Sequence, residues 1–271
     1  MKYLSIRFTR KAAVAAALGT TALLIGGPLL ANHAWSTYHW SRTTSQITPP
    51  VGDNVSSQWD SYLQTAVADW NQSAYIQSPL VAGQSNPRNC RPRAGRIEVC
   101  NSTYGNTGWL GIAQIWLSGG HISQGVTKLN DSYFNTAQYN TPAWRAAVTC
   151  QEIGHDYGLG HQDEDFSTDS TNSCMDYTSV PAGNEHPDAH DYQQLATIYT
   201  HTHSSSSASS SPVAAPSSAE GGNTVAEWGR AIHSTRDGRP DVFVREIAPG
   251  QRLITHVFWA LGEGPRGGDP H

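Results

Sequence analysis

Residues 150–161 read Cys-Gln-Glu-Ile-Gly-His-Asp-Tyr-Gly-Leu-Gly-His, and the spacing within this stretch decides the predicted fold. Gln151 and His155 are four residues apart, so their side chains share one face if the segment is helical. Gly158 lets the chain turn sharply after the helix, and His161 can then return to the same point. Two imidazoles and one oxygen ligand would meet there with one position left open, which is the arrangement of a catalytic zinc site.

A helix is expected to carry these residues from Thr141-Pro142 to about Tyr157. Threonine caps a helix through its side-chain oxygen, and proline favours the first helical position. Glu152 follows Gln151 directly, at the edge of the face that would hold the metal. A carboxylate in that position can take a proton from a metal-bound water during attack on a peptide carbonyl.

The segment resembles the signature of the metzincin metallopeptidases, H-E-x-x-H-x-x-G-x-x-H followed by a Met-turn. Four residues match it: Glu152, His155, Gly158 and His161. Gln151 stands in place of the first histidine. The resemblance implies an α/β (α+β) fold, in which a metzincin-like catalytic domain has a twisted mixed sheet, an active-site helix and a Met-turn. It also implies a zinc-dependent metalloendopeptidase with Glu152 as general base and three metal ligands, Gln151, His155 and His161.

A second match lies downstream at residues 173–177, Ser-Cys-Met-Asp-Tyr. Met175, one of only two methionines in the chain, follows His161 by 14 residues. It resembles the Met-turn, which in the family forms a hydrophobic floor beneath the metal. Tyr177 resembles the tyrosine that approaches the metal in some branches of the family and steadies the oxyanion.

Gln151 is the departure from the family pattern, because a carboxamide oxygen is a poorer zinc ligand than an imidazole. Three interpretations stay open. Gln151 supplies its oxygen as the third ligand of a working enzyme. Another group completes the site: His186, His190 or a carboxylate of Asp163–Asp165. Or the site is impaired, and the chain is a secreted binding module on a metzincin fold.

Other polar groups are weaker candidates. The acidic run at 163–165 could hold calcium, although such a run is more often a solvated loop. His121, beside a predicted turn, is expected to be a loop residue without a ligand role. His201 and His203, at the start of the predicted linker, are expected to be incidental.

Four cysteines in a chain with an export-like start predict two disulfides, for which three connectivities are possible. Cys150 directly precedes the helix motif and Cys174 precedes the Met-turn methionine, so a bridge between them would tie the two together. Cys90–Cys100 would then be the second bridge. An alternative makes Cys90 an inhibitory thiol, because Asn86–Cys90 resembles the cysteine switch of matrixins.

The charge distribution argues against nucleic-acid binding. The chain of 271 residues has 17 Lys and Arg against 22 Asp and Glu, a formal net charge of −5. Residues 1–34 hold four of the basic residues and none of the acidic ones, so the remainder carries 13 basic against 22 acidic residues. An acidic body without a basic patch is not typical of a nucleic-acid-binding protein. The expected partner is a protein or peptide substrate.

Residues 1–34 have the features of a targeting segment. A basic stretch ends at Lys11, and residues 12–31 run for 20 residues without a charge. They are predicted to be either a signal peptide, cleaved near Ala31 or Ala34, or an N-terminal anchor that just spans a bilayer. Both interpretations make the protein extracellular, either secreted or tethered to the outer face of the membrane.

The rest of the chain divides into four predicted segments. They are a polar leader (35–54), the metzincin-like catalytic domain (55–200), a serine-rich linker (201–224) and a small β unit (225–271) that forms a meander.

Within the domain, the apolar spacing predicts a helix over 56–75 and another over 187–199. Strands are expected across 108–130, with a turn at Gly119-Gly120. A peptide substrate is expected to bind by strand addition along an edge strand near 121–130.

Overall fold

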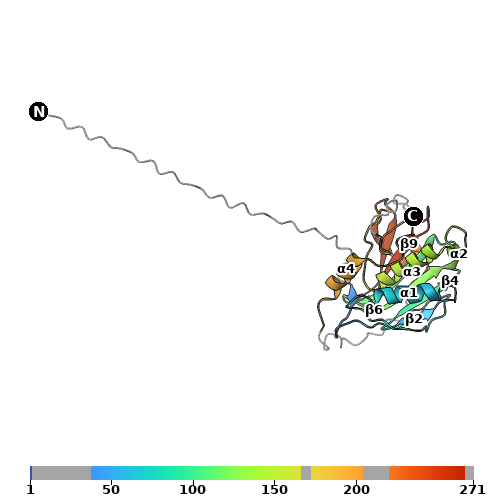
Figure 1. Ribbon diagram of the computed structural model, residues 1–271, viewed down its shortest axis with the longest axis horizontal. Helices are drawn as coiled ribbons and strands as arrows, with labels where there is room; N and C mark the ends of the chain where they lie inside the picture. The colour runs from blue at the N-terminus through green and yellow to red at the C-terminus, as the bar shows by residue number, and fades with distance from the viewer. Residues whose placement is uncertain (2–37, 166–171, 204–219, 266–271) are drawn as a thin grey trace. The chain divides into compact units, whose positions relative to one another are not determined.

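The residues that the computed structural model describes are Met1, 38–165, 172–203 and 220–265 (Figure 1). Apart from Met1, all of them belong to a unit that spans Asn32–His271. The predicted targeting segment at 12–31 lies outside the described residues. No helix within the described ranges is long and apolar enough to cross a membrane.

The elements follow one another as a mixed α/β chain. The strands are β1 (His39–Trp40), β2 (Val51–Asn54), β3 (Leu80–Ala82), β4 (Ile97–Ser102), β5 (Trp109–Ser118), β6 (His121–Asn130), β7 (Arg230–Ser234), β8 (Pro240–Ala248) and β9 (Gln251–Trp259). The helices are α1 (Asp60–Trp70), α2 (Asp131–Phe134), α3 (Pro142–Asp156), α4 (Ala189–Tyr199) and α6 (Val225–Trp228).

The strands form one twisted, nine-stranded sheet in the order β3-β2-β4-β6-β5-β9-β8-β7, with β1 paired to β6 outside that path. The first part of the sheet, β3-β2-β4-β6, is parallel. From β6 onward every pairing is antiparallel, through β5 to the C-terminal meander of β9, β8 and β7. The predicted α/β class with a C-terminal β meander is therefore confirmed.

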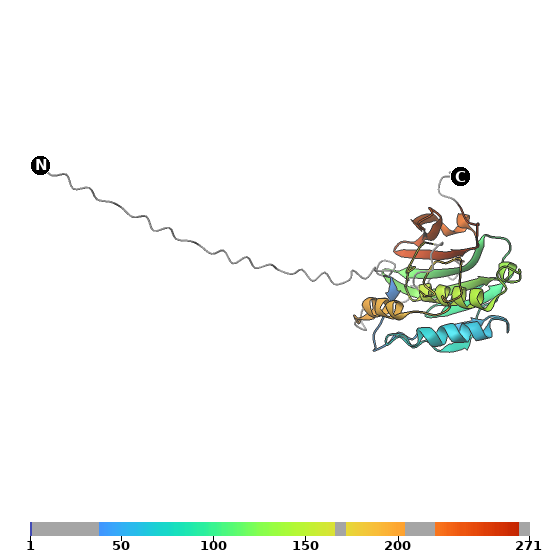
Figure 2. The same cartoon turned by 45° about the horizontal axis from the view of Figure 1, so that its top comes forward.

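Strand β5 joins the meander to the rest of the sheet. It pairs with β9 along its length, beginning with Trp109 opposite Trp259. The β unit predicted at 225–271 therefore continues the main sheet (Figure 2). The prediction of a substrate-binding edge at 121–130 is wrong, because β6 pairs with β4 on one side and with β5 on the other.

Helix α3 packs against β5 and β6, and α1 packs against α3 (Figures 1 and 2). The Thr141 side chain accepts a hydrogen bond from the Trp144 N–H, and Pro142 takes the first helical position. The helix ends at Asp156, and Gly158 adopts a φ of 95°, in the left-handed region that favours glycine. The predicted start and stop of this helix are confirmed.

The two flanking helices also form, one of them shorter than predicted. Helix α1 covers only the middle of 56–75, because the chain turns off after Trp70 and the Ser73 N–H bonds back to the Trp70 carbonyl. Helix α4 begins after Asp188, which forms a reciprocal capping box with Asp191.

The segment expected to be a leader contributes two strands to the sheet, β1 and β2. Strand β1 pairs with β6, and β2 lies between β3 and β4. Trp40 is buried, and its Nε1 donates to the Asp156 carbonyl at 2.8 Å. This part of the chain therefore helps to hold the C-terminal end of α3.

Candidate active site

Two imidazoles lie together at the C-terminal end of α3. His155, in the last turn, and His161, beyond the turn at Gly158, have ring centroids 4.8 Å apart. His155 Nδ1 is 2.8 Å from the Leu159 carbonyl, and because a carbonyl only accepts, Nδ1 carries the proton. His161 Nδ1 lies 3.2 Å from a carboxylate oxygen of Asp241. His155 therefore turns Nδ1 to a hydrogen-bond acceptor, and His161 turns Nδ1 toward a carboxylate without forming a hydrogen bond to it. Histidines that bind zinc are commonly held by an oxygen at the other ring nitrogen.

Gln151 is buried one turn of α3 before His155. Its Nε2 donates to the carbonyls of Cys174 at 2.8 Å and Asp176 at 2.9 Å. These acceptors fix the orientation of the amide, so Oε1 faces away from them. Oε1 is buried and has no hydrogen-bond partner among the residues described. A buried oxygen without a partner is unfavourable, and a bound cation is one group that would satisfy it.

Glu152 points from α3 to the sheet at Gly111 of β5. A Cβ on Gly111 would lie 2.7 Å from Glu152 Oε1, so glycine leaves room for the carboxylate. Neither carboxylate oxygen has a hydrogen-bond partner within the described part of the chain. Burial raises the pKa of Glu152 well above its usual value, and the neighbouring Asp156 carboxylate adds to the effect.

The Met-turn packs directly on α3. Met175 is fully buried, and a Cβ on Gly154 would meet its Sδ and the Trp70 ring. A disulfide joins Cys150 of α3 to Cys174 beside the methionine, with Cα atoms 5.9 Å apart. The helix and the turn are thus held together covalently as well as by packing.

Cys90 and Cys100 form the second disulfide, with Cα atoms 5.9 Å apart. The two bridges are those that the positions of the cysteines favour in the sequence. The alternative that makes Cys90 an inhibitory thiol is wrong, because its sulfur is bonded to Cys100 and no cysteine is free.

Strand β9 covers the site. The His256 ring stacks on the His155 ring with centroids 4.2 Å apart and planes 15° from parallel. The Phe258 ring lies 5.2 Å from the Tyr177 ring. The Tyr177 hydroxyl accepts a hydrogen bond from the Trp259 N–H at 3.0 Å. Tyr177, the residue expected to stabilise the oxyanion, is therefore hydrogen-bonded to the backbone of β9.

Sequence reasoning missed two groups that β8 and β9 bring to the site, Asp241 and His256. Asp241 lies between two histidines, with Oδ1 2.7 Å from His233 Nδ1. Burial acts to raise the pKa of Asp241, but the contacts with His161 and His233 outweigh it and lower the pKa to about 2. Burial lowers the pKa of His256 well below its usual value, and the nearby His155 adds to this. Both residues lie beyond the serine-rich linker, where no local spacing connects them to the motif.

Three of the alternative ligands expected from the sequence, His186, Glu164 and Asp165, have other partners, and His190 lies in the first turn of α4. His186 Nδ1 is 2.6 Å from an Asp69 oxygen, and its side chain is 62% exposed. Glu164 and Asp165 are paired with basic side chains of the β7–β8 hairpin. Gln151 therefore remains the candidate third ligand, and calcium at the acidic run remains a prediction, with two of its three carboxylates already paired.

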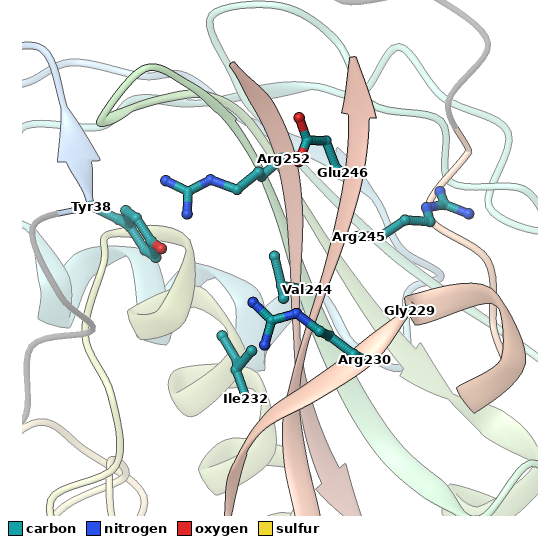
Figure 3. Close-up of a pocket in the computed structure, with 8 residues that line it drawn as sticks. All are labelled: Tyr38, Gly229, Arg230, Ile232, Val244, Arg245, Glu246 and Arg252. Atoms are coloured by element: carbon teal, nitrogen blue, oxygen red, sulfur yellow. The ribbon is translucent and has the colours of Figure 1, made fainter. Parts of the chain in front are cut away.

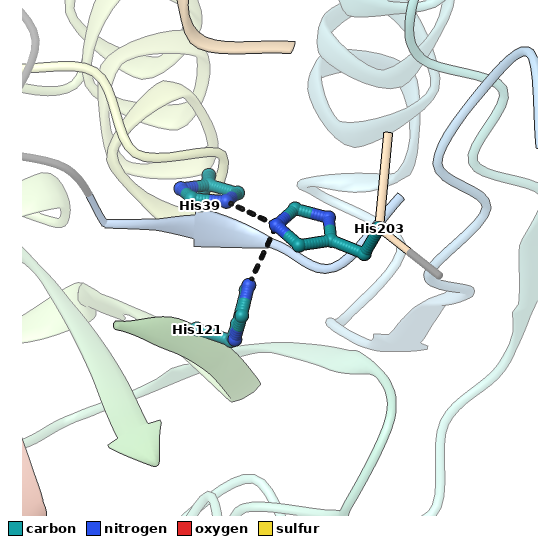
Figure 4. Close-up of side chains that lie close together, drawn as sticks. All are labelled: His39, His121 and His203. Atoms are coloured by element: carbon teal, nitrogen blue, oxygen red, sulfur yellow. Dashed lines mark hydrogen bonds between the residues drawn. The ribbon is translucent and has the colours of Figure 1, made fainter. Parts of the chain in front are cut away.

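A second group of histidines forms outside this site (Figure 4). His39 of β1, His121 of β6 and His203 offer ligand atoms that all lie within 4.8 Å of one another. Such a triad suits zinc. The sequence analysis predicts that His121 is a loop residue and that His203 is incidental, so this group was not predicted. Each histidine is isolated along the chain, and only the sheet pairing and the path after α4 bring them together.

An open pocket of about 460 Å³ lies between Tyr38 and the strands of the meander (Figure 3). Three arginines line it, Arg230, Arg245 and Arg252, together with Glu246. The Arg252 guanidinium lies over the Tyr38 ring, 5.4 Å from its centroid. None of the lining residues belongs to the predicted catalytic set.

No family model matches the chain, and no curated protein sequence matches it either. Among solved structures, the chain is similar to high choriolytic enzyme 1, a hatching enzyme zinc-protease from the medaka fish, Oryzias latipes. The two are 14% identical, the match covers 60% of this chain and 94% of that chain, and the TM-score is 0.33. A likeness this distant says nothing of the activity of this chain.

Proposed function

We propose that the chain is an extracellular zinc-dependent metalloendopeptidase whose site is covered by its own C-terminal strands. The observation that carries the proposal is the orientation of two buried imidazoles. His155 and His161 lie with ring centroids 4.8 Å apart, and each has Nδ1 beside an oxygen, 2.8 Å from the Leu159 carbonyl and 3.2 Å from the Asp241 carboxylate. This is how proteins hold zinc ligands, with the other ring nitrogen directed at the metal. Two disulfides support an oxidising, extracellular compartment.

The residues fit a zinc ion. His155 and His161 would bind it through Nε2, and Gln151 through the Oε1 that has no hydrogen-bond partner among the described residues. Bound zinc would polarise a peptide carbonyl and make the attacking water more acidic. Asp241 would orient His161 through its contact at Nδ1.

Glu152 would act as the general base. Burial raises the pKa of Glu152, and the positive charge of a bound zinc ion would oppose that shift and favour the carboxylate. Glu152 would then take a proton from the attacking water and pass it to the leaving amine. Met175 would support the floor of the site. Tyr177 would steady the oxyanion after its hydroxyl leaves the Trp259 N–H.

A substrate would add to β5, whose antiparallel pairing position is taken by β9 in this conformation. A peptide must therefore displace β9 before it can reach the site. The ring of His256 stacks on His155 and would also have to move before a peptide could bind. We infer a latent enzyme that opens when β9 moves.

A specific observation favours a second candidate, a secreted binding module without turnover. Gln151 uses its amide nitrogen to hold the carbonyls of Cys174 and Asp176, which is a structural role. An inactive site would show the same two hydrogen bonds from Gln151 and the same covering strand, β9.

Zinc content and hydrolysis of casein by the full chain separate the two candidates. We expect one zinc ion at this site and slow hydrolysis that Glu152→Gln abolishes without loss of zinc. His256→Ala should accelerate hydrolysis, because it removes the ring that covers His155, whereas the exposed control His186→Ala should not. If the wild type and His256→Ala both bind zinc and neither hydrolyses casein, the chain is the binding module and not the peptidase. Hydrolysis that survives Glu152→Gln would contradict the assigned base.

A further inference from the structure

Four histidines from three remote segments converge on one point. His39 lies in β1, His121 begins β6, and His201 and His203 follow α4. His203 Nε2 is 2.9 Å from His121 Nε2 and 3.3 Å from His39 Nε2. His201 Nε2 is 3.1 Å from His39 Nε2. Figure 4 shows the three rings of His39, His121 and His203 directed toward one another.

Hydrogen bonds between neutral imidazoles do not account for this convergence. Each ring nitrogen has a single direction in the ring plane, in which it either donates or accepts one proton. His203 Nε2 faces the Nε2 atoms of both His121 and His39, and His39 Nε2 also faces that of His201. Only two of these three contacts can be hydrogen bonds at the same time. A single cation between the rings of His39, His121 and His203 would satisfy the nitrogens of all three.

We propose that His39, His121 and His203 bind a structural zinc ion, with His201 as the fourth ligand. A tetrahedral zinc ion with Zn–N bonds of about 2.05 Å holds its nitrogen ligands about 3.3 Å apart. The ligand atoms of the first three histidines all lie within 4.8 Å of one another, and the two shortest separations are 2.9 and 3.3 Å. His201 lies 3.1 Å from His39 but outside that group, so its ring must move toward the ion. Imidazole nitrogen is a preferred ligand of zinc, and four protein ligands close the site as in structural zinc centres.

The surrounding fold builds this cluster. The pairing of β1 with β6 places His39 directly opposite His121. Arg42 is buried and fastens the segment after α4, because its guanidinium donates to the carbonyls of Thr200 at 2.9 Å and His201 at 3.2 Å. The His203 N–H donates to the Arg42 carbonyl at 2.7 Å. The rings are therefore set by backbone contacts that do not involve their Nε2 atoms.

One contact opposes the metal: the Arg42 N–H lies 3.2 Å from His203 Nδ1. Coordination through Nε2 moves the proton of His203 to Nδ1, so this long contact must open by a small rotation of the ring.

A zinc ion at this place would link β1, the start of β6 and the segment that follows α4. The four histidines share no residue with the site at α3. The inference does not depend on the proposed peptidase activity, and the two can fail separately.

The test is metal binding by the full chain, stripped with a chelator and titrated with Zn²⁺, with Co²⁺ as the spectroscopic probe. The wild type is expected to bind two equivalents, one at each site. His121→Ala and His203→Ala should each weaken the binding of one zinc equivalent by at least about 100-fold, because loss of a ligand lowers the affinity more than loss of a contact that supports a ligand. His186→Ala is the matched control and should keep both. Tryptophan fluorescence checks that each variant folds.

His161→Ala removes the other equivalent and so distinguishes the two sites. If zinc is lost in His161→Ala but not in His121→Ala or His203→Ala, this inference is overturned and the site at α3 stands. If the reverse holds, the histidine cluster binds the metal and the peptidase centre fails. A wild type that binds no metal overturns both.

Discussion

Substitution of Gly111 by alanine tests where the Glu152 carboxylate lies. A Cβ at this position would be 2.7 Å from Glu152 Oε1 and 2.7 Å from Val148 Cγ1. Ordinary van der Waals contact begins near 3.4 Å, so neither neighbour fits without a shift. Overpacking of this kind costs about 1–3 kcal/mol. We expect Gly111→Ala to lower the free energy of unfolding by that amount.

The cost should fall when Glu152 is shortened. Glu152→Ala removes both carboxylate oxygens and the Cγ that lies 2.8 Å from the added Cβ, and only Val148 stays in the way. In the double variant Gly111→Ala/Glu152→Ala, the penalty of the alanine should therefore be smaller by about 1 kcal/mol or more.

Urea unfolding followed by tryptophan fluorescence measures all four corners of this cycle. Gly120→Ala is the control, because a Cβ there meets nothing within 4 Å and the residue has no positive φ. Additive effects, within about 0.5 kcal/mol, would show that Glu152 does not face β5 and would refute its placement beside the strand.

Three further predictions concern the surroundings of the site and the sheet. Replacing both Cys150 and Cys174 by serine should lower the free energy of unfolding by about 3 kcal/mol, measured without reductant, because the bridge closes a loop of 24 residues. Tyr177→Phe should cost about 1–3 kcal/mol in urea unfolding, because it leaves the buried Trp259 N–H without its acceptor. Burial lowers the pKa of Lys128 to about 8, below the value of about 10.4 in an unfolded chain. As the pH rises, the native state releases this proton at a lower pH than the unfolded chain does. The free energy of unfolding of the wild type should therefore increase by up to about 3 kcal/mol, relative to that of Lys128→Met, between about pH 8 and about pH 10.4.

Each of these has a result that would count against it. Unchanged stability of the serine pair would mean that the disulfide does not constrain the chain. A Tyr177→Phe variant as stable as the wild type would remove the bond to β9. If the free energies of unfolding of the wild type and Lys128→Met change in parallel across the alkaline range, the pKa of Lys128 is not lowered in the native state.

Local patterns in the sequence predicted the part of the site that one helix and one turn carry. The cap at Thr141, the stop at Gly158 and the packing of Met175 on α3 all follow from contacts between residues close along the chain. The cysteines adjoin these motifs, so their pairing could be anticipated from position. The C-terminal meander was predictable because strand and turn signals alternate clearly, whereas the mixed sheet was expected only from the resemblance to the metzincins.

What the sequence did not reveal arises from pairing between remote segments. Nothing in the alternation of β9 says which strand it joins, so the cover over β5 and the approach of His256 and Asp241 were not foreseen. The interior position of β6 depends in the same way on its two neighbours. The cluster around His39 and His203 is the extreme case, since 164 residues separate the two rings.

Zinc content in a chain that lacks the histidine cluster is the most direct measurement of the centre at α3. The variant His39→Ala/His203→Ala is predicted to retain one zinc ion, held by His155, His161 and Gln151. Addition of His161→Ala should remove it. A double variant without zinc, or a triple variant that still binds it, would contradict the assignment of these residues as a metal centre.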